Sequence, residues 1–350
     1  MNLTDLSHLA RWQQNQGEFG DVAVSSRVRL ARNLAGMSFL SRCSDRQVRE
    51  IADLLRRVLT SGILGEGASY IDITEVDPLD RQLLVERHLI SRQHAEGDGP
   101  RGVAVTSDET LAVMVNEEDH LRMQVLAGEV KLKAAYEDIC RFDGLLEEHL
   151  TFAFSSRFGY LTACPTNVGT ALRVSVMLHL PALKMTGEIE KTLRSARDMH
   201  LAVRGLYGEG TEAIGDLFQV SNQTTLGKSE EQIVEEFRNQ IVPGIIEYER
   251  SARAALLENR RTALEDRVFR ASAVMKSARL ISSEETMFLI SQLRLGVNLD
   301  IIKDVTVETL NELSLLTAPA HLQRFCGRQM SPMERGQARA KLIREKLGGS

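Results

Sequence analysis

The sequence predicts an α+β protein in which a mixed domain is followed by an all-helical one. Strand-like segments, including a hairpin pattern, occur in the first two-thirds of the chain, whereas the pattern from Ser229 to Leu347 is almost wholly helical. The chain has 350 residues, of which 43% are hydrophobic, so it is long enough for two domains. We place the mixed domain at residues 21–255 and the helical domain at residues 256–350, after a polar lead-in over residues 1–20.

The mixed domain is expected to begin with a strand over residues 21–30. Alternation along it puts Arg27 and Arg29 on one face and the apolar residues between and after them on the other. Further strands are expected at 70–73, 102–106, 110–115, 152–154, 173–180 and 200–204, and helices at 45–61, 78–89, 120–140 and 185–196.

Three helix starts in the C-terminal part carry a capping-box pattern, a serine followed three residues later by Gln or Glu. They lie at Ser229, Ser282 and Ser331, and Pro332 takes the first position of the last helix. The pair Pro243-Gly244 is expected to kink or break the first of these helices.

Composition excludes several classes of protein. With 43 Lys and Arg against 48 Asp and Glu, the net charge of -5 disfavours general nucleic-acid binding. No apolar run approaches the ~18 residues of a membrane span, and the first residues lack the basic start and apolar core of a secretion signal. The four cysteines are scattered, and no histidine pair has ligand spacing. We therefore expect a cytoplasmic protein with no metal site of its own, no nucleic-acid partner and no membrane contact.

Two segments imitate phosphate-binding motifs. Gly227-Lys228-Ser229 resembles the end of a P-loop, but Asn222 stands where that motif needs glycine. The glycines around Glu209 approximate a dinucleotide fingerprint, but they lie outside any strand–helix–strand unit. Neither segment is expected to bind a nucleotide in the manner of its motif.

The first segment with chemical meaning is Ser25-Ser26-Arg27-Val28-Arg29-Leu30-Ala31-Arg32-Asn33. Two arginines on one strand face are unfavourable there unless an anion compensates their charge. No lysine precedes Lys131; genomic base composition explains this bias as well as a requirement for arginine's forked donors does. The alternative for the segment is an exposed edge strand with solvated charges.

The second segment is Asn116-Glu117-Glu118-Asp119-His120-Leu121-Arg122, directly after an apolar strand. Three consecutive acids repel one another unless a cation lies among them. An ordinary solvated loop is the alternative, but strand ends hold functional loops rigidly.

The third segment, Cys164-Pro165-Thr166-Asn167-Val168-Gly169-Thr170, offers a thiol, two hydroxyls and backbone amides together, with Arg173 on the strand that follows. The alternative is a buried structural cysteine.

The fourth segment, Arg204-Gly205-Leu206-Tyr207-Gly208-Glu209-Gly210, is a glycine-rich loop with one arginine and one carboxylate. A mobile surface turn is the alternative.

Together the four segments suggest phosphoryl transfer to a guanidinium. Five arginines could surround a polyphosphate without a P-loop, because this chemistry depends mainly on alignment and charge neutralisation. Glu118 and Glu209 would remain for a cation, and a guanidinium matches carboxylates bidentately and needs help to lose a proton. The arginines concerned are Arg27, Arg29, Arg122, Arg173 and Arg204.

In this order the four segments closely resemble the motifs of the phosphagen, or guanidino, kinases, over about residues 20–255. Within that family the chain looks most similar to the bacterial protein-arginine kinases. The resemblance implies a catalytic domain with an antiparallel sheet flanked by helices, and ATP-dependent phosphorylation of arginine side chains in proteins.

The resemblance also implies roles for individual residues. Glu118 would be the catalytic base, Glu209 a second carboxylate on the guanidinium, and Cys164 a thiolate beside the acceptor. Mg²⁺ would be carried by the ATP. The ATP-binding surface would comprise Ser25, Ser26, Arg27, Val28, Arg29, His88, Arg122, Arg173, Val174, Ser175, Val176, Met177, Arg204, Gly205, Leu206, Tyr207, Gly208 and Glu209.

Two departures from the small-molecule guanidino kinases favour a protein substrate. The resemblance implies that the small-molecule enzymes have a helical domain ahead of the catalytic one, which helps to enclose their substrate. Here the first motif already begins at Ser25, which leaves no room for such a domain, so the acceptor site is expected to stay open. The additional domain lies instead at the C-terminus, as in the protein-arginine kinases.

That C-terminal domain resembles one with an Arg-Asp-x-x-Arg-Ala motif proposed to hold phosphoarginine as an allosteric signal. This chain has Arg335 and Arg339 one helical turn apart, but Gly336 replaces the acid. The alternative is a solvated basic helix face.

The resemblance further implies partners: protein substrates, the CtsR repressor, a zinc-containing activator of the McsA type, the ClpC–ClpP protease, which would degrade the marked proteins, and a second copy of the chain in a dimer. Two other functions stay open. One is a kinase of free arginine or another small guanidine, and the other is a non-catalytic adaptor that binds phosphoarginine.

Overall fold

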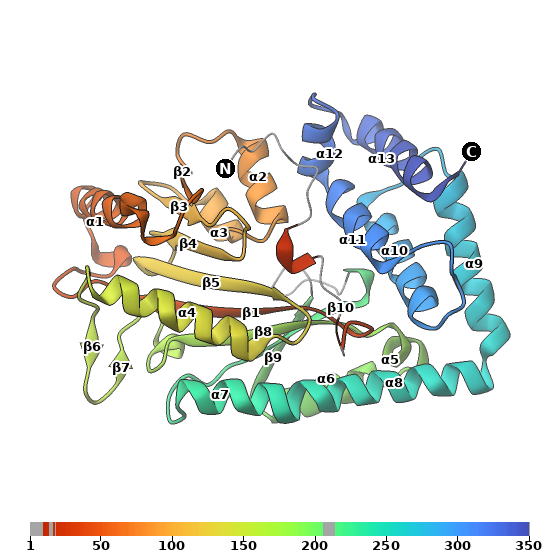
Figure 1. The fold of residues 1–350 in the computed structure, drawn as a ribbon, viewed down its shortest axis with the longest axis horizontal. Helices are drawn as coiled ribbons and strands as arrows, with labels where there is room; N and C mark the ends of the chain where they lie inside the picture. The colour runs from red at the N-terminus through yellow and green to blue at the C-terminus, as the bar shows by residue number, and fades with distance from the viewer. Residues whose placement is uncertain (1–9, 14–16, 18, 206–213, 350) are drawn as a thin grey trace.

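The structure, a computed structural model, describes residues 10–13, 17, 19–205 and 214–349. Within these residues, strands from both ends of the mixed region form one antiparallel sheet in the order β2-β3-β4-β5-β1-β8-β10-β9, and a separate hairpin pairs β6 with β7 (Figure 1). The strands are β1 Ala23–Arg32, β2 Ser69–Asp72, β3 Gly102–Val105, β4 Leu111–Val115, β5 Leu121–Gly128, β6 Phe154–Ser155, β7 Gly159–Tyr160, β8 Leu172–His179, β9 Leu201–Gly205 and β10 Leu217–Asn222.

Strand β1 lies in the middle of the sheet, between β5 and β8. Arg29 is paired with Gln124 on one side and with Arg173 on the other, so both edges of the strand are hydrogen-bonded. The alternative of an exposed edge strand is therefore wrong. Arginines from neighbouring strands share one face of a central sheet.

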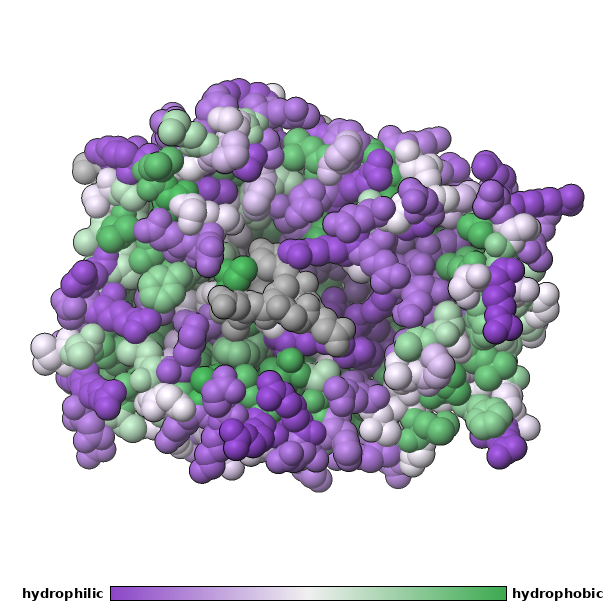
Figure 2. Space-filling model, turned by 180° about the vertical axis from the view of Figure 1, so that it is seen from behind, coloured by the Kyte–Doolittle hydropathy of each residue, from purple (hydrophilic) through white to green (hydrophobic). Residues whose placement is uncertain are grey.

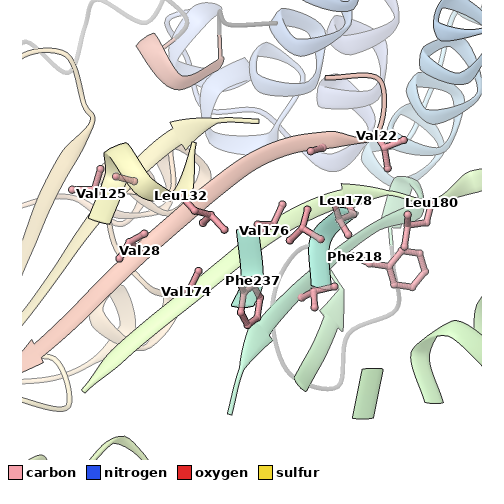
Figure 3. Close-up of a cluster of buried hydrophobic side chains, with 14 of the residues drawn as sticks. Val22, Val28, Val125, Leu132, Val174, Val176, Leu178, Leu180, Phe218 and Phe237 are labelled. Carbon is pink, nitrogen blue, oxygen red and sulfur yellow. The ribbon is translucent and has the colours of Figure 1, made fainter. Parts of the chain in front are cut away.

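The opposite face of these strands is apolar and forms the main core. Val28, Val174 and Val176 are fully buried there, together with Phe218 of β10 and Phe237 of the following helical segment (Figure 3). The helices α4 and α7 pack over this face. Because successive side chains alternate between faces, burying the valines fixes which face presents the arginines.

The helices agree with the expected change of character along the chain. They are α1 Asp45–Val58, α2 Pro78–Glu86, α3 Arg92–Glu96, α4 Leu132–Glu147, α5 Pro181–Thr186, α6 Ile189–Asp198, α7 Glu230–Glu236, α8 Val242–Asn259, α9 Arg261–Ser277, α10 Ser283–Asn298, α11 Val307–Leu316, α12 Pro319–Phe325 and α13 Pro332–Leu347. Full capping boxes form at Ser229 and Ser331, and Ser282 accepts a hydrogen bond from the backbone of Glu285. A π-helical turn immediately precedes Val242, so the predicted interruption near Pro243 is present.

The predicted helix over residues 120–140 is wrong in its first half. Residues Leu121–Gly128 form strand β5, and α4 begins only at Leu132. Leu, Arg, Met, Gln and Ala in this segment favour a helix locally, but Leu121, Met123 and Val125 are buried on one face with a period of two. Pairing with β4 and β1 on both sides outweighs the local preference.

The C-terminal helices α9–α13 gather at one end of the molecule, beside α2 and the end of the sheet (Figure 1). Helix α8 runs through the expected boundary at residues 255–256 and ends at Asn259, and the division into two domains stays a prediction. No helix in the described part of the chain is both long and apolar enough to span a membrane.

Candidate active site

A cavity of about 620 Å³ opens on the arginine face of the sheet. It brings together residues from three of the four sequence segments and the first arginine of the last one. Its lining includes Arg29, Glu118, Arg122, Cys164, Arg173 and Arg204. We call it the arginine–carboxylate cavity. Figure 2 shows this side of the molecule, where hydrophilic residues border a hollow near the middle.

A second cavity, of about 300 Å³, shares Arg29 and Arg204 with the first. It lies between the sheet and the C-terminal helices, that is, between the two predicted domains, and we call it the interdomain cavity. The sheet side contributes Ser25, Arg27, Ser175 and Met177, the loop after α2 contributes His88, and helices α10 and α11 contribute Ser291, Arg294 and Asn311. The two cavities together offer room for an elongated anionic ligand with a polar acceptor at one end.

The electrostatics of the arginine cluster (Arg27, Arg29, Arg122, Arg173 and Arg204) favour the binding of an anion. Burial and the nearby guanidinium groups of Arg122, Arg173 and Arg204 lower the pKa of Arg27 to about 10. The same two causes lower the pKa of Arg29 well below its usual value, and Glu117 opposes them only in part. The buried Nε of Arg29 has no hydrogen-bond partner among the described residues. A triphosphate fits this donor set, because it supplies both the countercharge and the acceptors.

Neighbouring strands orient the cluster. Arg27 Nη2 donates to Gln219 Oε1 at 3.1 Å, and Arg173 Nη2 donates to Ser221 Oγ at 3.2 Å. Both acceptors stand on β10, a strand that the sequence pattern did not indicate. The alternation of polar residues at 219 and 221 with Phe218 and Val220 could have indicated this strand.

The three acidic residues of the second segment differ in their contacts. Glu117 is buried, accepts from Arg122 Nη1 at 2.6 Å and from Ser91 Oγ at 2.6 Å, and so positions that arginine. Asp119 accepts from the side-chain amide of Asn33 at 2.6 Å and from the backbone N–H of Ala163 at 2.7 Å. Asp119 therefore ties the acidic loop to the loop that carries the cysteine.

Glu118 and Asp119 both line the arginine–carboxylate cavity, but Asp119 is engaged by Asn33 and Ala163, which leaves Glu118 as the candidate to act on a ligand. Burial, followed by the neighbouring charge of Asp119, raises the pKa of Glu118, and Arg122 opposes the shift. A carboxylate with a raised pKa is a stronger proton acceptor than a solvated one, which suits a general base.

Cys164 lines the same cavity, immediately before the turn Pro165–Asn167. Its Sγ lies 3.0 Å from Thr166 Oγ1, and its carbonyl accepts from Thr162 Oγ1 at 2.8 Å. Cys164 is half-buried, so the alternative of a fully buried structural cysteine does not hold.

His88 is held in an unusual conformation at the wall of the interdomain cavity. Its φ of 60° is left-handed, and its ring makes an edge-to-face contact with Trp12 at 5.8 Å. Burial, reinforced by Arg27 and His321, lowers the pKa of His88 to about 4, so the ring is neutral at physiological pH.

A buried network next to His88 joins α2 to α12. Glu86 accepts from the backbone N–H groups of Ala320 and His321 and from His321 Nδ1, at 2.8–3.1 Å. Arg87 donates to both carboxylate oxygens of Glu109 at 2.8 Å. The C-terminal helices are thereby fastened to the segment that positions His88.

Some residues of the expected ATP-binding surface point away from both cavities. Val28, Val174 and Val176 are in the core, and Ser26 is buried on the same face, where its Oγ accepts from the backbone of Lys131. The side chains of these residues hold the strands in register and do not reach a ligand in either cavity. Gly205 ends β9, and Leu206, Tyr207, Gly208 and Glu209 lie outside the described residues.

Arg32, the third arginine of the first segment, also faces away from the cavities. It is 1% exposed and donates to Asp143 at 2.5 and 3.1 Å and to the carbonyl of Thr170 at 3.3 Å. Its guanidinium lies 3.4 Å above the ring of Tyr160. Arg32 therefore supports the cysteine loop from behind.

The proposed phosphoarginine residues are engaged with backbone carbonyls. Arg339 is buried and donates to Thr317 O and Ile281 O at 2.8 and 3.1 Å, and Arg335 donates to Met330 O at 2.9 Å. A Cβ at Gly336 would lie 2.7 Å from Leu280 Cδ1. The solvated-face alternative does not describe Arg339, whose guanidinium stabilises the packing of α13.

Within the described residues, no group of three His, Cys, Asp or Glu side chains could hold a metal ion. Among the described residues, the site consists of clustered guanidinium groups that share a cavity with Glu118, Asp119 and the thiol of Cys164, the arrangement expected for transfer of a phosphoryl group between an anionic donor and a cationic acceptor.

Comparison with known proteins defines the class. Residues 50–252 match the family described as ATP:guanido phosphotransferase, C-terminal catalytic domain. The fold is similar to a duplicated taurocyamine kinase from Schistosoma mansoni with bound transition state analog components (28% identity, TM-score 0.60, 71% of this chain and 36% of that chain). It is also similar to lombricine kinase (26% identity, TM-score 0.57, 72% and 71%). The chain belongs to the ATP:guanido phosphotransferase family, a family of ATP-using kinases.

The remainder of the chain narrows the family further. Residues 261–350 match the protein-arginine kinase McsB C-terminal domain. Similar proteins named protein-arginine kinase come from Halothermothrix orenii (44% identity over 99% of both chains) and Symbiobacterium thermophilum (45% identity, 97% of this chain and 96% of that one). A third, from Geobacillus stearothermophilus, is 43% identical over 97% of this chain and 94% of its own. The chain is thus a member of the protein-arginine kinases.

Proposed function

We propose that this protein transfers the terminal phosphoryl group of ATP to the guanidinium group of arginine side chains in proteins. The observation that carries the proposal is the shared cavity: Glu118 and Cys164 face the same space as Arg29, Arg122 and Arg173. A donor and an acceptor bound there would meet in one enclosed volume, as phosphoryl transfer requires. Membership of the protein-arginine kinases supports protein-bound arginine as the acceptor.

The residues divide the chemistry among them. The arginine cluster neutralises the phosphates, and Glu118 accepts the proton that the attacking guanidinium nitrogen loses as the N–P bond forms and the bond from phosphorus to ADP breaks. Cys164 lies where it can orient the guanidinium, and Glu209 is proposed as a second carboxylate on it. We propose that Mg²⁺ arrives with the nucleotide and neutralises phosphate charge that the arginines leave uncompensated.

The wider setting is proposed from the family resemblance. The partners would be the CtsR repressor, an activator of the McsA type and the ClpC–ClpP protease, in the cytoplasm. Self-association would use the C-terminal helices, which support it with exposed apolar side chains such as Phe269, Phe288 and Phe325. Arg335 and Arg339 remain proposed phosphoarginine ligands, although binding there would need both guanidinium groups to leave their carbonyl partners.

The decisive experiment is mass spectrometry for acid-labile phosphate on arginine after incubation with MgATP. A loosely folded protein and free arginine are offered side by side, with Glu118→Ala as the matched inactive control. We expect phosphoarginine in the protein, little on free arginine, and none with the variant. Preferential labelling of free arginine would indicate a small-guanidine kinase, and binding of phosphoarginine peptides without any transfer would indicate an adaptor.

A further inference from the structure

The hairpin β6–β7 presents apolar side chains to solvent next to the active site. Phe154 and Phe158 are 61% and 44% exposed, and Leu226, on the loop facing them, is 55% exposed. Between the hairpin and residues 225–231 lies a groove of about 400 Å³, which we call the hairpin groove. Adjacent exposed apolar side chains that border a cavity mark binding surfaces more often than isolated ones do.

The hairpin groove is rigid. Tyr160 and Gly169 exchange backbone hydrogen bonds at 2.8 and 3.3 Å, and Thr170 N–H donates to Thr225 O at 3.0 Å. A Cβ on Gly159 would lie 2.5 Å from Gly169 O, so the hairpin and the cysteine loop are in direct backbone contact. Arg32 stacks beneath Tyr160 from the core side. A preformed groove of this kind does not itself have to become ordered when a peptide binds, so only the peptide pays an ordering cost.

The groove is continuous with the acceptor end of the site. Thr225 lines both the hairpin groove and the arginine–carboxylate cavity. Its hydroxyl is within hydrogen-bond distance of the carbonyls of Thr166 and Val168, at 2.9 and 2.8 Å, and Thr166 lines the cavity with Cys164. Thr225 therefore lies between the proposed position of the target guanidinium and the apolar groove.

The walls of the groove favour an apolar occupant. Its charged lining residues are Arg157 and Lys228 against Glu230 and Glu231, which balance in number, so no net charge selects the ligand. Phe154 packs edge-to-face on Tyr160, and the guanidinium of Arg157 lies 5.0 Å from the ring of Phe158. These contacts leave aromatic surface available along the rim.

We propose that the hairpin groove binds the substrate polypeptide beside the target arginine and selects an apolar side chain there. The inference rests on the proposed function and names the substrate class: segments of unfolded protein in which large apolar residues flank an arginine. Side chains on one face of an extended chain repeat every ~7 Å, so an extended segment can fill the groove while its arginine enters the cavity. Free arginine has no neighbouring residue and gains nothing from the groove.

The test compares two blocked peptides of equal length, each with a single arginine, flanked in one by phenylalanine and in the other by glycine. The variants are Phe158→Ala and Leu226→Ala. The matched control is Tyr248→Ala, because Tyr248 is 62% exposed on α8 and lines neither the hairpin groove nor the two cavities. Phosphorylation kinetics give KM and kcat, fluorescence anisotropy of labelled peptides gives Kd, and urea midpoints check folding.

In the parent, the phenylalanine peptide should have the lower KM. Either groove variant should raise its KM and Kd about tenfold, as expected for loss of one buried apolar contact, with kcat unchanged. The glycine peptide should change less than about twofold, and Tyr248→Ala should behave as the parent. Equal effects on both peptides, or none, would overturn the inference. If the parent phosphorylated neither peptide, the proposed function would fail, and the anisotropy data alone would decide whether the groove binds apolar segments.

Discussion

Replacement of Arg32 by methionine should strongly destabilise the protein even though the residue does not reach either cavity. Arg32 is 1% exposed and makes two hydrogen bonds to Asp143, at 2.5 and 3.1 Å, and two more to the carbonyls of Ala31 and Thr170. Methionine fills much of the volume but leaves the Asp143 carboxylate buried without its cation. Breaking one partner of a buried pair costs about 3–5 kcal/mol, out of the ~5–15 kcal/mol that stabilises a typical fold.

The assay is urea unfolding followed by far-UV circular dichroism, with Arg46→Met as the control. Arg46 pairs with Glu50 on the surface of α1 and its side chain is 88% exposed, so its replacement should leave the urea midpoint close to that of the parent. The double variant Arg32→Met with Asp143→Leu should recover much of the loss, because the stranded carboxylate is removed as well. A loss below about 1 kcal/mol for Arg32→Met, or no recovery in the double variant, would refute the assigned role.

Three further predictions concern the site itself. Glu118→Gln should lower kcat by about 10²–10⁴-fold with little change in ATP affinity by calorimetry. Burial raises the pKa of Glu118 above its ordinary value of 4.5. Because only the carboxylate form can accept the proton, kcat/KM should fall as the pH drops through that raised pKa. A fall in kcat/KM centred at or below pH 4.5 would exclude Glu118 as the base. Cys164→Ser should slow phosphoryl transfer without changing the urea midpoint. A rate equal to that of the parent would mean that Cys164 contributes only to packing. Arg29→Met should weaken ATP binding at least tenfold yet raise the urea midpoint of the ligand-free protein, since it relieves repulsion within the arginine cluster; a lower midpoint would contradict that account.

The features of the sheet that could be predicted from the sequence are those that follow from the alternation of polar and apolar residues along a strand. The period of two around Arg27 and Arg29 correctly put both on one face, and the apolar residues of β8 located its buried side. The same alternation held information that the prediction did not use: Arg32 has the parity of Val28 and Leu30, which places it behind the sheet.

Features that depend on distant partners could not be predicted in this way. Strand β5 is composed of good helix formers and becomes a strand because β4 and β1 flank it. The division of labour between Glu117 and Glu118 follows from where Arg122 and Ser91 lie in space, and adjacent glutamates look alike in sequence. Nothing local in α10 or α11 indicates that Ser291 and Asn311 would face the sheet.

The interdomain cavity has walls from both ends of the chain, with Arg27 and His88 on one side and Ser291 and Asn311 on the other. A ligand bound in that space would contact both walls, so it would stabilise the packing of α10 and α11 against the sheet. A fragment lacking the last five helices would present its anion pocket half open to water.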